Sequence, residues 1–269
     1  MMNLKQLINK SVYGTIGYIS SQEDLNILEQ YIAYNLPVLK EFKRIAAFTN
    51  YRDYSDTDLI LKNNSLWIKY FPDCVFINNP INRGHNFGTA DLDNLAFNYC
   101  KSMKIEWLCK SSNDTLLQSS ILDKQINEAD FYYMNGIGYG GLQTHNFDFD
   151  KVIKEDFFPQ TNFYFMNIDK VDCIVEKEYL DKTYEYVQSI PNYTGKVWDY
   201  VEGWSCETFL RNCINRNNLI KEHLVSEEEY LKLLYIIKEY QIYDPSHKNI
   251  MVGGICHYHF FNNDINEIK

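Results

Sequence analysis

The chain has 269 residues, a net charge of −10, 45% hydrophobic residues and only 12 Gly and 6 Pro. This is the composition of a folded globular protein, and it excludes disordered, collagen-like and low-complexity chains. With 26 basic against 36 acidic residues the chain repels a phosphate backbone, so nucleic acid is not an expected partner.

The first 135 residues alternate short apolar runs with longer amphipathic ones, which is typical of β-α-β units in a mostly parallel sheet. Helices are predicted after the capping signal at 20–24, where apolar residues recur at helical spacing from 25 to 36, and over 55–70 and 89–103. Strands are predicted over 12–19, 44–49, 74–78, 105–109 and 131–134. The expected fold is α/β and Rossmann-like, with ligands at the carboxyl ends of the strands.

After Asn135 the regular alternation of short apolar runs and longer amphipathic runs changes. Four glycines between 136 and 141 open a loop that runs to about residue 160. The next predicted strand is 162–168, followed by helices over 170–189, 205–217 and 226–240 and by a strand or hairpin over 250–261. No internal repeat or long linker is found, so we expect a single domain over 1–269 with two halves, about 12–135 and about 136–261.

The cysteines and the amino terminus indicate a cytoplasmic protein. Seven Cys are scattered without a C-x-x-C pair, which is typical of reduced, buried thiols. The first 18 residues lack the apolar core of a signal peptide, and no stretch reaches the roughly 18 apolar residues of a membrane span.

Aromatic residues are in excess, with 22 Tyr and 16 Phe beside abundant Asn. An AT-rich genome, as in a low-GC bacterium, a phage or a large virus, explains this bias through codon usage alone. The alternative is a sugar-binding cleft lined by rings and amides.

Asn113 and Asp114 follow the predicted strand 105–109, at the edge where an open α/β sheet binds ligands. A carboxylate there can hold a divalent cation against a diphosphate. Alternatively, Asp114 only caps a helix over 115–125.

The loop 78–88 joins a predicted strand to a helix start. Its two Gly permit close backbone approach, Arg83 offers a fork of donors, and the helix start favours an anion. The alternative is an ordinary polar loop with Gly84 at a positive φ.

Glu207 falls at the start of the predicted helix 205–217, and Glu202 lies just upstream. A carboxylate beside Trp204 in a partly dry cleft can act as a general base, whereas the alternative is an acid that complements the helix dipole. His257 and His259 share a face of an extended chain and could complete a metal site with Asp114. The alternative is a pair of structural His residues.

Taken in order, these pieces resemble the GT-A type of nucleotide-sugar-dependent glycosyltransferase, in a form like family 2. The segment from Asn82 to Ala90, the following helix, and the strand that leads into Ser112-Asn113-Asp114 look like the family's Asn-x-Gly loop, helix and D-x-D motif. Ser112 replaces the first Asp of that motif. The run Cys206-Glu207 before Leu210 and Arg211 is similar to the family's acidic pair, with Cys206 in place of the first acid.

The resemblance implies a role for each candidate residue. The residue 12–135 half would bind the nucleotide sugar, and the 136–261 half would bind the acceptor and carry the catalytic base. Glu207 would be the base of an inverting transfer, and Mn²⁺ or Mg²⁺ would bind Asp114 with His257 or His259. The expected substrate-binding residues are Tyr18, Ser20, Asn50, Tyr51, Asn82, Arg83, Lys110, Asn113 and Trp204. Of these, Tyr18, Tyr51 and Trp204 are candidates for stacking on base or sugar.

The partners implied are a nucleoside-diphosphate sugar and a carbohydrate or glycoconjugate acceptor. Two alternatives remain: a nucleotidyltransferase of related fold, and a catalytically inactive relative that binds glycans or partners. The first normally carries a Gly-rich loop and a basic residue after the first strand, which residues 18–21 lack; the second is suggested by Ser112 and Cys206.

Overall fold

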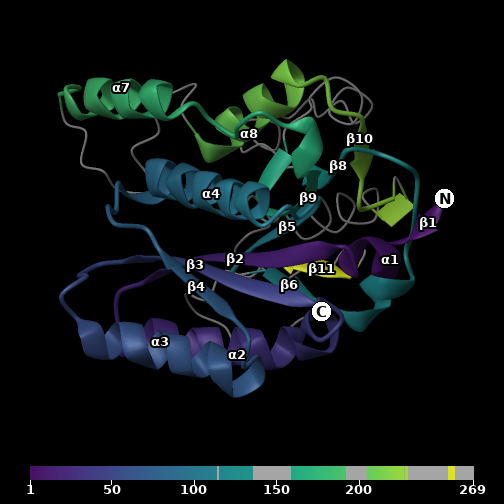
Figure 1. Cartoon of the computed structure of the whole chain (residues 1–269), viewed down its shortest axis with the longest axis horizontal. Helices are drawn as coiled ribbons and strands as arrows, with labels where there is room; N and C mark the ends of the chain where they lie inside the picture. The colour runs from purple at the N-terminus through teal and green to yellow at the C-terminus, as the bar shows by residue number, and fades with distance from the viewer. Residues whose placement is uncertain (114, 136–158, 192–204, 227, 230–253, 258–269) are drawn as a thin grey trace, which may run out of the picture.

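At the centre of the computed structural model is a seven-stranded sheet in the order β10-β8-β9-β5-β2-β3-β4 (Figure 1). The structure describes residues 1–113, 115–135, 159–191, 205–226, 228–229 and 254–257. The strands of the sheet are β2 (Ser11–Ile19), β3 (Arg44–Tyr51), β4 (Val75–Asn78), β5 (Trp107–Ser112), β8 (Phe131–Asn135), β9 (Pro159–Asn167) and β10 (Lys221–His223).

Most neighbours in this sheet are parallel. Strands β4, β3, β2 and β5 run parallel to one another, and β10 runs parallel to β8. Strand β9 runs antiparallel between β5 and β8. The predicted α/β class with a mostly parallel sheet is confirmed. Because β9 is reversed, its amino-terminal end lies at the same edge as the carboxyl ends of β2, β3 and β5.

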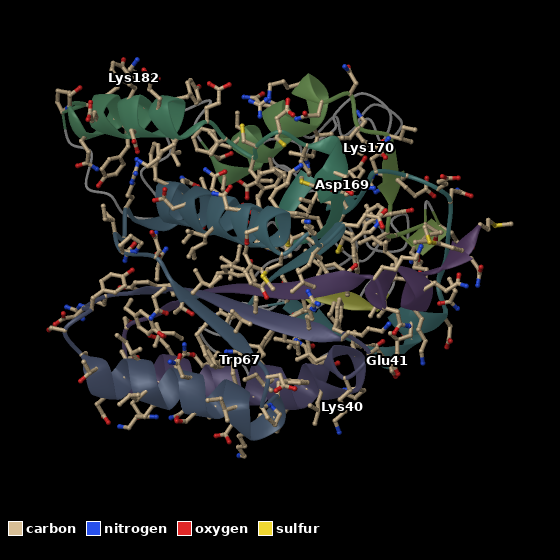
Figure 2. The ribbon with its side chains drawn as sticks, viewed as in Figure 1. Lys40, Glu41, Trp67, Asp169, Lys170 and Lys182 are labelled. Carbon is tan, nitrogen blue, oxygen red and sulfur yellow. The ribbon has the colours of Figure 1, made fainter. Side chains whose placement is uncertain are left out.

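Helices cover both faces of the sheet. In Figure 1, α2 (Gln22–Leu39) and α3 (Thr57–Tyr70) lie on one side, and α4 (His85–Ser102) and α8 (Cys206–Arg216) lie on the other. Helix α7 (Lys177–Gln188) packs outside α4 and α8, where Leu180 and Val187 meet Phe87 and Phe209. Trp67 of α3 is buried toward the sheet, whereas Lys182 of α7 points away from the molecule (Figure 2).

Strand β2 contributes side chains to two hydrophobic clusters, one on each face of the sheet. This is expected of a central strand that is covered on both faces. Tyr13 and Ile19 belong to the cluster on the α2 and α3 side, whereas Val12 and Ile16 belong to the cluster on the α4 and α8 side. Period-two alternation along the strand therefore fills both layers.

Local signals account for where the helices begin. Ser21, Asp56 and Ser205 cap α2, α3 and α8, each accepting a bond from a backbone N–H in the first turn. Gly84 precedes α4 with φ 87°, a conformation that favours glycine. The positive φ that was considered for Gly84 in loop 78–88 is therefore confirmed.

Short elements complete the described part of the chain. Strand β1 (Met2–Asn3) pairs with β7 (Gln125–Ile126), and β6 (Thr115–Leu117) pairs with β11 (Ile255–His257), both antiparallel. Helix α1 is Leu4–Ile8, and the 3₁₀ turns η1 and η2 are Ser119–Asp123 and Ile168–Lys170.

Three predicted elements need correction. Residues 115–125 form β6, η1 and β7 in place of a helix, because Thr115–Leu117 finds a strand partner in β11. The predicted helix 89–103 begins earlier, at His85, and the predicted helix 170–189 divides into η2 and α7. The predicted helix 226–240 and most of 250–261 lie outside the described residues. None of the helices in the described part is both long and apolar enough to cross a membrane.

Candidate active site

The carboxyl ends of β2, β3 and β5 meet the first turns of α4 and α8 at one edge of the sheet, which we call the carboxyl edge. Tyr18 of β2 lies beside Asn50 of β3 in the parallel register, and Ile16 lies beside Ser112 of β5. The Tyr18 ring is 46% exposed, so it is available to stack on a planar ligand.

Two glycines let polar side chains approach this edge closely. A methyl group on Gly17 would lie 3.0 Å from Asn113 Nδ2, and one on Gly88 would lie 2.9 Å from Asn50 Nδ2. Asn50 Nδ2 donates to the Gly88 carbonyl (3.2 Å), whereas its buried Oδ1 has no hydrogen-bond partner among the described residues. The Oδ1 atom of Asn50 therefore has unused acceptor capacity beneath the surface of this edge.

Tyr51 and Ser20 are engaged within the protein. Tyr51 is fully buried, and its hydroxyl accepts a bond from Asn63 Nδ2 (2.7 Å). Burial raises its pKa. The expectation that Tyr51 binds substrate through its ring is wrong, because the ring is fully buried in the core on the α3 side of the sheet. The Ser20 hydroxyl and amide both donate to Asp24 Oδ2 at 2.7 Å, which leaves only the hydroxyl's acceptor capacity.

Arg83 and Asn82 shape the loop before α4. Asn82 Oδ1 accepts from the Gly84 amide (3.0 Å), and its Nδ2 lies 3.4 Å from the Tyr51 carbonyl. The Arg83 guanidinium is 11% exposed, with Nε 3.2 Å from Asp91 and Nη2 2.5 Å from Asp181.

Arg83 therefore joins α4 to α7 through Asp91 and Asp181, and its contact with a diphosphate stays a prediction. Burial raises the pKa of Asp91 to about 6 despite the opposing charge of Arg83.

Lys110 points into the protein from β5. Its side chain is fully buried, and Nζ donates to the Thr161 carbonyl and to Ser112 Oγ (3.3 Å). Asp93 Oδ1 of α4 lies 4.0 Å from the same nitrogen. Burial raises the pKa of Asp93 to about 6, and the charge of Lys110 opposes this rise. Lys110 is thus close to the carboxyl edge but lies beneath it, and the burial of its side chain argues against the predicted direct contact with a ligand.

Glu207 occupies the first turn of α8, after the Ser205 cap. Thr161 Oγ1 donates to its Oε1 (2.9 Å), and the Cys206 thiol donates to its Oε2 (3.3 Å). The next residue on β9, Asn162, accepts a bond at its carbonyl from Thr115 Oγ1 (3.2 Å). Two consecutive residues of β9 therefore join Glu207 to the strand that directly follows position 114.

The β6–β11 pairing brings distant segments together at this place. Its register sets His257 opposite Thr115, the residue after Asp114. Asp114, Glu202, Trp204 and His259 lie outside the described residues, as does most of the loop 136–160. Among the described residues, no three His, Cys, Asp or Glu side chains form a metal-binding group. The predicted metal ligands therefore remain a prediction.

Sequence reasoning missed Asp93, Thr161 and Tyr164 as parts of this region. Tyr164 is fully buried beside Asp93, and each affects the pKa of the other. One signal was present: Lys110 interrupts the apolar run that begins at Trp107, and a buried ammonium requires a partner.

A shallow depression of about 490 Å³ lies elsewhere, between η1 and the β11 turn. It contains the Lys124–Glu229 ion pair and none of the carboxyl-edge residues. We therefore place the candidate site by its chemistry at the carboxyl edge.

Comparison with known proteins finds no matching family model and no matching curated protein. Among solved structures, an active-site mutant of LgtC has a TM-score of 0.50 at 8% identity, over 94% of this chain and 92% of that one. A galactosyltransferase LgtC complex with donor and acceptor sugar analogues has a TM-score of 0.47 at 9% identity, over 94% and 91%. A nucleoside-diphosphate-sugar pyrophosphorylase from Vibrio cholerae RC9 has a TM-score of 0.39 at 13% identity, over 79% and 90%.

The likeness to the LgtC mutant concerns the fold. It covers nearly the whole of both chains, and together with the seven-stranded sheet it confirms the predicted Rossmann-like, GT-A-like fold.

Proposed function

We propose that this chain is a glycosyltransferase that moves a sugar from a nucleoside-diphosphate sugar to an acceptor hydroxyl, with inversion at the anomeric carbon. The observation that carries the proposal is the placement of Glu207. Thr161 holds its carboxylate at the carboxyl edge, and the neighbouring Asn162 bonds Thr115, the residue after Asp114. The proposed base thus lies close to the strand that follows the proposed cation ligand Asp114, and displacement of a diphosphate requires both groups.

Glu207 would act as the general base. The acceptor oxygen attacks the anomeric carbon while the bond from that carbon to the diphosphate oxygen breaks. Glu207 takes the proton of the acceptor hydroxyl, and the nucleoside diphosphate leaves with the electron pair of the broken bond. The bonds from Thr161 and Cys206 hold the carboxylate in one orientation, which is the preorganisation that such a step needs.

A divalent cation would be held by Asp114 with His257 or His259. Carboxylate oxygen and imidazole nitrogen are suitable ligands for Mn²⁺, and the β6–β11 register brings the backbone of His257 next to the Asp114 turn. Bound there, the cation would neutralise charge on the diphosphate. The need for one is supported by the side chains at the edge: Arg83 is paired with two carboxylates, and Lys110 is buried.

The nucleoside would lie on the exposed ring of Tyr18, within reach of Asn50 and Asn113. Trp204 remains a proposed stacking residue for base or sugar. The 136–261 half would complete the acceptor site.

The first test is thermal unfolding of the full chain with a panel of nucleoside diphosphates and their sugars, with and without Mn²⁺. One nucleotide should raise the midpoint, because a ligand bound only to the native state stabilises it by mass action. EDTA and Asp114→Ala should each remove the metal-dependent part of the shift. Asp73→Ala, which removes an exposed carboxylate in the turn before β4, is the control and should retain it.

The second test is product analysis with the nucleotide sugar so identified. Nucleoside diphosphate should be released, and Glu207→Gln should lower kcat by about 100-fold or more with little change in nucleotide binding. Formation of nucleoside triphosphate from pyrophosphate would instead indicate a nucleotidyltransferase. Binding without turnover in wild type would indicate an inactive relative, and a product of retained configuration would exclude Glu207 as the base.

A further inference from the structure

We propose that Cys173 and Cys213 form a site of reversible oxidation, at which a small-molecule disulfide such as glutathione disulfide converts the two thiols into one intramolecular disulfide. Cys173 lies between η2 and α7, and Cys213 lies on α8. Neither is among the residues that we place at the carboxyl edge, and the proposal does not depend on the proposed function.

The two cysteines are in contact where α8 meets the segment that precedes α7. The Cys213 thiol donates to the Cys173 carbonyl at 3.4 Å. A carbonyl oxygen lies about 2.4 Å from the Cα of its own residue, so Cys213 Sγ is within about 6 Å of the Cys173 Cα. A disulfide joins residues whose Cα atoms are about 4.4–6.8 Å apart. The two residues are therefore near enough for a disulfide to form by side-chain rotation and a small backbone adjustment.

Arg216, one turn further along α8, holds the Cys173 sulfur toward α8. Its Nη2 donates to the Cys173 carbonyl (2.7 Å) and to Cys173 Sγ (3.2 Å). Because one nitrogen atom bonds both, the carbonyl oxygen and the sulfur of Cys173 lie on the same side of that residue. The Cys213 sulfur contacts this same carbonyl, so both sulfur atoms lie near one backbone oxygen. Cysteines that undergo exchange are typically partly exposed and beside a cation, as Cys173 is.

The exposure of the two thiols sets the order in which they react. Cys173 is half-buried, whereas Cys213 is fully buried in the cluster on the α4 and α8 side of the sheet. Burial raises the pKa of Cys213 to about 12, an effect that the charge of Arg216 opposes, so Cys213 is a protonated thiol at neutral pH. Cys173 therefore meets the small disulfide first, and Cys213 reacts in the second step.

The exchange has two steps. The Cys173 sulfur attacks one sulfur of the glutathione disulfide, which breaks the bond between the two glutathione sulfurs and releases one glutathione as a thiol. The Cys213 sulfur then attacks the Cys173 sulfur in this mixed disulfide and releases the second glutathione. The two thiol protons of the protein leave with the two released glutathiones. The cysteine pair is oxidised, and the glutathione disulfide is reduced by the same number of electrons.

The disulfide would link two positions that are 40 residues apart, and the loop so closed contains α7 and the first turns of α8. A covalent link of this kind restricts the unfolded chain more than the native chain, so it stabilises the fold. It would also anchor α8, the helix that carries Glu207, to the segment before α7. Oxidation should therefore be visible as a rise in stability.

The test is incubation of the reduced, folded full chain with excess glutathione disulfide, followed by alkylation of the remaining thiols and mass spectrometry of the intact chain and its peptides. The wild type should carry two fewer alkylated thiols, and the Cys173 and Cys213 peptides should be cross-linked. The thermal midpoint should rise by about 5 °C or more, and dithiothreitol should reverse both changes.

Cys213→Ala should stop the reaction at one glutathione bound to Cys173, and Cys173→Ser should leave Cys213 unmodified because the buried thiol does not meet the reagent. Cys100→Ala, which removes another fully buried thiol, is the matched control and should still form the cross-link. If Cys213→Ala does not fold, the wild-type cross-link and Cys173→Ser still decide the proposal. Absence of the cross-link in wild type, or a cross-link that forms only after unfolding in urea, would overturn it.

Discussion

Asp93 and Asp91 show how burial changes the acid–base behaviour of single carboxyl groups. Burial raises the pKa of each to about 6, above the value of about 3.9 for Asp in an unfolded chain. Between pH 4 and 6 the native state therefore binds more protons than the unfolded state. By linkage, the stabilisation from these two groups is largest near pH 4 and is lost as the pH rises through 6.

Asp93→Asn should make the free energy of unfolding less dependent on pH in this window, by about 2 kcal/mol between pH 4 and 6. Urea unfolding at a series of pH values measures it. Asp53→Asn is the control, because the bonds from the Ser55 amide and hydroxyl lower the pKa of Asp53 and its contribution is lost only below about pH 4. An Asp93→Asn curve parallel to wild type would mean that Asp93 titrates normally in the folded protein.

At the scale of the element, strand β6 depends on one side chain from α2. Asn35 is fully buried, and its Nδ2 donates to the Thr115 carbonyl (2.9 Å) while its Oδ1 accepts from the Leu117 amide (2.7 Å). The amide thus satisfies both backbone groups of β6 on the side away from β11. It fixes the strand that begins directly after Asp114.

Asn35→Ala should cost about 2 kcal/mol in urea unfolding, because two buried backbone groups lose their partners. It should also weaken the metal-dependent part of the nucleotide-induced thermal shift. Asn9→Ala, which removes one exposed amide bond to the Lys5 carbonyl, should cost no more than about 0.5 kcal/mol. Equal losses in the two variants would mean that Asn35 does not support β6.

The elements show which parts of the fold the sequence could predict. The strands and helices of the first half were predictable because their patterns are local: alternation in β2, helical spacing in α2 and a cap at Ser21. Strand β6 was not, because Thr115–Leu117 becomes a strand only through a partner 140 residues further along the chain.

The candidate site, like the fold, has parts that the sequence could predict and parts that it could not. Its location followed from the rule that ligands bind at the carboxyl ends of parallel strands, and the exposed Tyr18 and the helix-start position of Glu207 agree with the prediction. Arg83, Lys110 and Tyr51 were assigned to ligands because their chemistry suits that role. Their true partners, Asp181, Asp93 and Asn63, come from other elements, and only the folded structure brings them near.

At the scale of the whole molecule, the net charge of −10 should oppose an anionic donor. In EDTA, association of the free nucleoside diphosphate should therefore become faster when NaCl rises from about 20 to 300 mM, because salt screens the repulsion. With saturating Mn²⁺ the donor carries less charge, and the dependence should flatten. Stopped-flow binding measures both. A rate that falls with salt would reveal a cationic site that Arg83 and Lys110 do not provide.

The pairing of β6 with β11 also bears on how the protein is made. Residues 115–117 leave the ribosome roughly ten seconds before residues 255–257, at common rates of synthesis. Until then β6 has one edge without its strand partner, and Thr115 lacks the neighbouring segment that contains His257. A nascent chain can therefore form the first β-α-β layers early, but β6 gains its strand partner only after residues 255–257 have been made.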